Sequence, residues 1–93
     1  MSAPKCEKHS DQITHFGNDF DSLAKEIGDL RYDALHELLL KLSNKIKEDA
    51  NKDREGGRVV LSDNLYSLSE TLDFSSNRAK SAWDICKPFM ENK

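Results

Sequence analysis

The sequence predicts an all-α protein, built as a three-helix antiparallel bundle or as a long helical hairpin with a shorter N-terminal helix laid along it. Apolar residues recur at spacings of three and four along three stretches, which is the periodicity of a helix with one apolar side. Only two Pro and four Gly interrupt the 93 residues. The single β-branched cluster, Val59-Val60, has no alternating segment with which it could pair as a strand. The three helices are expected over about residues 11–27, 29–55 and 58–87.

The first helix has the most regular apolar pattern in the chain. Ser10 or Asp11 is expected to cap its start. Gly28 is expected to end it and Asp29 to cap the next helix, so that the two helices are antiparallel neighbours across a very short link. The alternative is one long, kinked helix that continues through Gly28 into Leu30. The apolar residues that alternate at spacings of three and four are Ile13, Phe16, Phe20, Leu23 and Ile27.

The second helix is expected to be the central one. Leu38 and Leu40 widen its apolar surface beyond a single stripe, so it needs partners on more than one side. From Lys47 to Glu55 the residues are polar all round, and Gly56-Gly57 form a natural stop and turn, because Gly adopts positive φ without a Cβ clash. The stripe that we expect to be buried consists of Tyr32, Leu35, Leu39, Leu42 and Ile46.

The third helix has two possible starts and one weak point. It can begin directly after the glycines at Arg58, which we prefer, or at Ser62 as the N-cap residue. Residues 73–77 are rich in side chains that compete for backbone groups, yet one helix with a weak middle is preferred to two shorter ones. Pro88 cannot continue a helix interior, so the helix should end near Lys87. Its apolar positions are Leu61, Leu65, Leu68, Leu72, Ala79, Ala82 and Cys86.

The helices form one domain, expected over residues 10–88, between a flexible N-terminal segment of residues 1–9 and a C-terminal tail of residues 89–93. A chain of 93 residues buries only about 60–65% of its unfolded surface, so its stability margin is narrow. The hairpin also outreaches the first helix, which leaves part of its stripe without an internal cover. We therefore favour a homodimer that closes a larger bundle over a monomer.

Three motifs resemble metal sites, and each of them is incomplete. His36-Glu37 starts like the zinc-binding motif H-E-x-x-H, but Leu40 occupies the position of the second histidine. Asp33-x-x-His36 resembles half of a di-iron carboxylate site, and the chain contains no second copy. Cys6-x-x-His9 with His15 offers three ligands where a structural zinc site normally has four. We expect no metal and no cofactor.

No catalytic residue is expected either. Cys86 lies at a position typical of a packed side chain, and the sequence supplies no obvious histidine that would make it a nucleophile. Gly56-Gly57-Arg58 lacks the spacing and the preceding strand of a phosphate loop. The net charge of −3 gives no general attraction for nucleic acid, and no run is apolar and long enough to cross a membrane. Cys6 and Cys86 do not resemble a disulfide framework, which favours a reducing, cytoplasmic setting.

Two surfaces are candidates for binding a protein partner. Between Asp11 and Glu37 the chain carries seven acidic and two basic residues, which makes the first half of the protein acidic. Near the C-terminus, aromatic and Met side chains beside a proline either cap the core or form a binding patch. The residues singled out are Asp19, Asp21, Glu26, Asp29 and Asp33 in the first group, and Trp83, Phe89 and Met90 in the second.

The sequence therefore indicates a small non-enzymatic helical interaction protein, such as an adaptor, a regulator or a subunit-like module. Two alternatives stay open: a regulator that binds nucleic acid directly, and a metal or enzyme site formed across a dimer interface. Salt-sensitive binding to generic DNA or RNA would favour the first alternative, and bound metal in the purified protein would favour the second.

Overall fold

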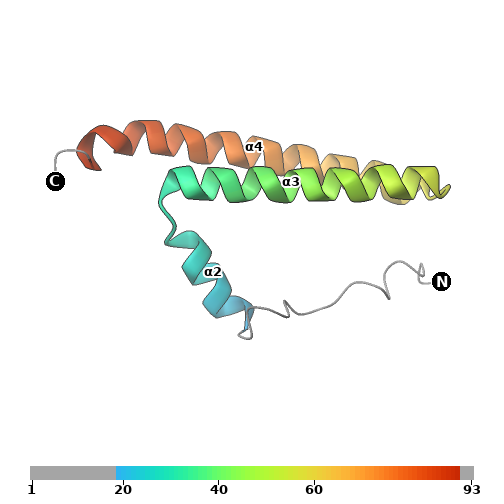
Figure 1. Cartoon of the computed structure of the whole chain (residues 1–93), viewed down its shortest axis with the longest axis horizontal. Coiled ribbons are helices and arrows are strands. Elements are labelled where there is room, and N and C mark those ends of the chain that lie inside the picture. Colours follow the sequence, from blue (N-terminus) through green and yellow to red (C-terminus); the bar gives the residue numbers. More distant parts are fainter. Residues whose placement is uncertain (1–18, 91–93) are drawn as a thin grey trace.

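The computed structural model describes residues 19–90 as three helices: α2 (Phe20–Gly28), α3 (Tyr32–Glu55) and α4 (Val59–Met90). The expected all-α hairpin is confirmed, since α3 and α4 lie side by side over their length and carry nearly all contacts between helices (Figure 1). The N-terminal helix is not laid along them. Figure 1 shows α2 directed away from the hairpin, so the expected antiparallel packing of the first two helices is wrong.

The residues between α2 and α3 are not helical, so α2 and α3 do not form a single kinked helix. Asp19 caps the start of α2, where its carboxylate accepts a hydrogen bond from the Ser22 backbone N–H at 2.9 Å. Asp29, expected to cap the following helix, instead ends α2, because its N–H donates to the carbonyls of Ile27 and Lys25. Arg31 precedes α3 and has a non-helical backbone conformation. Its side chain makes no capping hydrogen bond. The first helix was expected over about residues 11–27, but Asp19 is extended and directly precedes α2, so the expected helix does not continue unbroken through this position. The expected caps Ser10 and Asp11 and the segment 1–9 lie outside the described residues.

The turn between α3 and α4 has the hydrogen bonds of a Schellman motif. The N–H of Arg58 donates to the Asp53 carbonyl at 2.8 Å, and the N–H of Gly57 donates to the Arg54 carbonyl at 3.0 Å. Gly57 has φ +84°, a left-handed conformation that glycine adopts without a Cβ clash. Arg58 Nε also donates to the Asp53 carboxylate at 2.8 Å, which joins the two sides of the turn. The expected stop at Gly56-Gly57 is therefore confirmed.

α4 is one continuous helix of 32 residues. Its start at Val59 confirms the earlier of the two expected starts, and Ser62 lies inside the helix, fully buried. Residues 73–77 do not interrupt it. The expected end near Lys87 is wrong: α4 passes through Pro88 and includes Phe89 and Met90, which were expected in the tail. A proline this close to a helix end removes a single late hydrogen bond and leaves the preceding turns intact.

The two long helices meet through small side chains. Three serine hydroxyls donate across the hairpin to backbone carbonyls: Ser43 to Ser69 at 2.8 Å, Ser62 to Ala50 at 2.9 Å and Ser76 to His36 at 3.0 Å. These positions repeat every seven residues on each helix, the period with which two helices keep one side facing the other. We call them the seam, and it consists of His36, Ser43 and Ala50 on α3 and Ser62, Ser69 and Ser76 on α4.

The apolar stripes of α3 and α4, which were expected to face the core, are only partly buried. Among the described residues, the only buried apolar side chains are Ala50 and Ala79. Leu42 and Leu68, which belong to the two expected stripes, are each 44% exposed. Small seam residues bring the helices so close that the larger side chains beside them lie on the flanks of the hairpin, and α2 does not cover them. None of the three described helices is long and apolar enough to cross a membrane.

Candidate protein-binding surface

The flank of the hairpin carries a continuous set of aliphatic side chains, which we call the leucine face. Each of its residues comes one or four positions before a seam residue, which places it about 40–100° to one side of the seam. Because the helices are antiparallel, the same offset on both helices leads to the same side of the hairpin. The leucine face consists of Leu35, Leu39, Leu42 and Ile46 on α3 and Leu61, Leu65, Leu68 and Leu72 on α4.

The opposite flank of the hairpin is mostly polar, with Leu40 as an exposed apolar residue on it. Its residues come one or four positions after a seam residue, so they lie on the other side of the seam. Lys47 pairs with Asp73 across the helices at 3.6 Å, and the Tyr66 hydroxyl donates to the Asn51 side-chain oxygen. The two flanks of the hairpin therefore differ: polar contacts join the helices on one, and the other carries the eight partly exposed aliphatic side chains of the leucine face.

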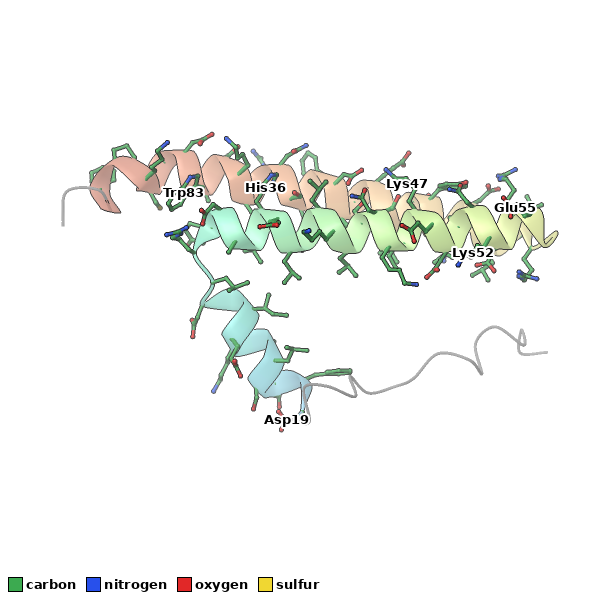
Figure 2. The ribbon with its side chains drawn as sticks, in the orientation of Figure 1. Asp19, His36, Lys47, Lys52, Glu55 and Trp83 are labelled. Atoms are coloured by element: carbon green, nitrogen blue, oxygen red, sulfur yellow. The ribbon has the colours of Figure 1, made fainter. Side chains whose placement is uncertain are left out.

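The open end of the hairpin is held by a group of polar and aromatic residues. The Arg31 guanidinium donates two hydrogen bonds to the Asp33 carboxylate, at 2.7 and 2.9 Å, and lies 5.1 Å from the ring centroid of Trp83. His36 Nδ1 lies 2.8 Å from the Ser76 carbonyl oxygen and 2.7 Å from its hydroxyl. Figure 2 shows His36 and Trp83 at this end and Lys52 and Glu55 near the turn. These contacts fasten the start of α3 to the second half of α4.

The pKa values of the ion pair follow from this geometry. The hydrogen bonds from Arg31 lower the pKa of Asp33 below its ordinary value of 3.8, and the same contacts raise the pKa of Arg31. At the start of α2, the hydrogen bond from the Ser22 backbone lowers the pKa of Asp19. Both carboxylates are therefore ionised throughout the neutral range.

The acidic residues proposed as a partner surface do not form one surface. Asp19, Asp21 and Glu26 are exposed on α2, and Asp29 is exposed directly after it. Figure 2 shows Asp19 at the end of α2 that lies far from the hairpin. Asp33 belongs to the first turn of α3, where Arg31 neutralises it. Their role in binding a partner stays a prediction.

The C-terminal candidates also differ from one another. Trp83 is half-buried and contacts Arg31, so it packs at the open end of the hairpin. Phe89 is 73% exposed near the end of α4, where it covers no part of the hairpin interior. Met90 is the last residue of the helix. A core-capping role therefore fits Trp83 and does not fit Phe89.

The incomplete metal motifs take part in structural contacts. Asp33 is paired with Arg31, His36 contacts Ser76, and Glu37 lies 3.6 Å from Lys41. Within residues 19–90, no three His, Cys, Asp or Glu side chains are grouped so that they could hold a metal ion. Cys86 is half-buried, whereas the motif of Cys6, His9 and His15 lies outside the described residues.

Reasoning from the sequence missed both the seam and the exposure of the leucine face. A signal was available, because Ser62, Ser69 and Ser76 recur at intervals of seven, as do His36, Ser43 and Ala50. Comparison of the chain with protein-family models, with curated proteins and with solved structures found no match.

Proposed function

We propose that the chain is a small non-enzymatic interaction protein that associates with a second copy of itself through the leucine face. The observation that carries the proposal is the aliphatic flank of the hairpin, on which Leu42 and Leu68 are exposed and the other six side chains are only half-buried. Water-exposed apolar surface of this continuity is rare on a monomer and typical of a protein interface. A homodimer closes it within a four-helix bundle.

The leucine face is complementary to itself. On α3 the aliphatic residues follow one another at intervals of four, three and four, and α4 repeats the same intervals. Two stripes of equal length and equal spacing match the same two stripes of a second copy related by a two-fold axis. A two-fold interface of this kind needs no further partner and leaves no part of either stripe exposed.

The expected strength of the association is moderate. Complete burial of a leucine stabilises by about 1.5–3 kcal/mol, so covering the 44% of Leu42 or Leu68 that is exposed contributes about 1 kcal/mol for each. Association costs about 4–15 kcal/mol in lost translational and rotational freedom, which offsets much of the free energy gained by burying the whole leucine face. We expect a dissociation constant of about 1–100 μM.

Charge and composition support a protein partner over nucleic acid. Basic residues near the turn are paired with acids, Arg54 with Asp63 at 2.6 Å and Lys45 with Asp49 at 2.7 Å. A net charge of −3 opposes binding to a polyanion. The two cysteines, 80 positions apart, support a reducing, cytoplasmic setting.

The test is the mass of the protein in solution, measured by light scattering over a dilution series. The unaltered chain should change from dimer to monomer as the concentration falls through the micromolar range. Leu42→Glu and Leu68→Glu should each give a monomer at every concentration, because a charge would be buried in the interface. Val60→Glu is the control, since Val60 is 86% exposed on the outer side of α4.

Circular dichroism should show equal helix content in all these variants. A wild-type protein that is monomeric at hundreds of micromolar would contradict the proposal, as would a Leu42→Glu variant that remains dimeric.

A further inference from the structure

We propose that α2 is a hinged cover for the leucine face, which docks on the hairpin of its own chain and thereby competes with the second copy. This inference rests on the proposed function, because it assigns a regulatory role to α2 at the same surface. In Figure 1, α2 points away from the hairpin, which is the open form of the cover. Leu42 and Leu68 of the leucine face are exposed in this form.

The apolar stripe of α2 is not buried within the part of the chain that the structure describes. Phe20, Leu23 and Ile27 lie on one side of the helix at spacings of three and four. No residue of α2 is buried, and Phe20 is 59% exposed. The same molecule therefore holds two uncovered apolar surfaces, one on α2 and one on the hairpin.

The two surfaces match in antiparallel register. Followed backwards from Ile27, the stripe of α2 has intervals of four and three, to Leu23 and Phe20. Followed forwards from Leu35, the stripe of α3 has the same intervals, to Leu39 and Leu42. Each stripe therefore spans seven residues, or about 10.5 Å of helix. Docking of α2 alongside α3 sets Ile27 beside Leu35, Leu23 beside Leu39 and Phe20 beside Leu42.

The connection between the helices places the hinge at the correct end of the leucine face. α2 ends at Gly28 and α3 begins at Tyr32, close to Leu35, the first leucine-face residue. Arg31 is fastened to the hairpin by Asp33 and Trp83, so the change in backbone direction is confined to Asp29 and Leu30. A short tether keeps α2 at a high effective concentration near the face, which lets a nine-residue helix compete with a whole second chain.

Competition gives a measurable consequence. The dimer forms from two chains, and the leucine face of each must be open. The apparent dissociation constant therefore equals the intrinsic one divided by the square of the open fraction. When the apolar residues of α2 are replaced by polar ones, α2 no longer docks, and the leucine face of every chain is accessible. Self-association should therefore become tighter when apolar residues of α2 are replaced, which is the opposite of the effect expected if α2 contributed to the dimer interface.

The experiment compares the dissociation constants of the full chain and of Phe20→Ser/Leu23→Ser by sedimentation. We expect the double variant to dimerise at least three-fold more tightly, and Lys25→Ser, on the other side of α2, to match the unaltered chain. A dissociation constant that is unchanged, or that rises, in the double variant would overturn the proposal.

A second measurement detects the docked form whether or not the dimer exists. In a chain with Cys6→Ser and Cys86→Ser, the pair Leu23→Cys and Leu39→Cys should form an intramolecular disulfide under mild oxidation at low concentration. The pair Lys25→Cys and Leu39→Cys should not. Without the first cross-link the cover is rejected, even if the protein dimerises. A cross-link in a chain that never dimerises rejects self-association and the competition with it, while docking of α2 stands.

Discussion

Ser43 illustrates how the close packing of α3 and α4 depends on small side chains. Its hydroxyl is fully buried and bonded to the Ser69 carbonyl on the facing helix, at 2.8 Å. A buried hydroxyl is costly unless it is bonded, and here the bond also ties the two helices together. Residues of this kind specify how closely the helices approach, although they contribute little apolar burial.

Replacement of Ser43 should therefore be most harmful when the new side chain is large. Ser43→Leu should destabilise the protein by about 1–3 kcal/mol in urea unfolding, because the seam has no room for the added carbons. Ser43→Ala should lose only the hydrogen bond, about 1 kcal/mol. The exposed Ser67→Leu is the control and should leave stability nearly unchanged. Equal stability of Ser43→Leu and the unaltered chain would mean that the helices are not this close.

The ion pair of Asp33 and Arg31 predicts a dependence of stability on pH. The pKa of Asp33 is lowered in the folded protein, so the pair stabilises the fold above the ordinary pKa of 3.8 and loses this effect as the pH falls through the lowered value. Asp33→Asn should lower the thermal midpoint at pH 7. The difference between the two proteins should shrink as the pH falls through the lowered pKa of Asp33, and a difference that stays constant would have another origin.

The sequence predicted that the three helices exist but not how they pack. Periodicity identifies the apolar side of a helix but not the element against which that side packs. Spacings of three and four were sufficient for the existence of all three helices and for the turn at Gly56-Gly57. They were misleading about the side on which α3 and α4 meet, since leucines mark the flank and serines the seam. The direction of α2 depends on Asp29 and Leu30, whose backbone conformations are not encoded by any apolar pattern.

The turn between α3 and α4 depends on one glycine. Gly57→Ala should destabilise the hairpin by about 1–2 kcal/mol, because a Cβ is disfavoured at a φ of +84°. Gly28→Ala provides the comparison. A Cβ at Gly28 would meet nothing within 4 Å, and its φ is not positive, so alanine should be neutral or stabilising by about 0.4–1 kcal/mol. Thermal unfolding of both variants at one protein concentration measures the contrast.

The described part of the molecule buries few apolar side chains completely, so we do not expect it to be strongly stable by itself. The described residues bury two alanines and several polar groups, and the larger aliphatic side chains stay partly in water. The leucines of the candidate site could be identified from the sequence. Their exposure could not, because it depends on the side on which α3 and α4 meet.

If the dimer is the stable form, unfolding should depend on protein concentration. Association with a second copy stabilises only the folded chain, so the thermal midpoint should rise as the protein is concentrated from about 5 to 500 μM. Leu68→Glu should abolish this dependence and keep the lower midpoint throughout. A midpoint that is independent of concentration in the unaltered chain would contradict self-association.

The seven-residue repeat of the seam affects how the register between α3 and α4 is specified. If α4 slid by one heptad along α3, Ser62 would take the place of Ser69 and Ser69 that of Ser76, and hydroxyls would again face carbonyls. The repeat itself therefore cannot distinguish the correct alignment from its neighbours. That choice is left to features that occur once: the left-handed Gly57 at the turn, and the contacts of His36 with Ser76 and of Arg31 with Trp83 at the far end.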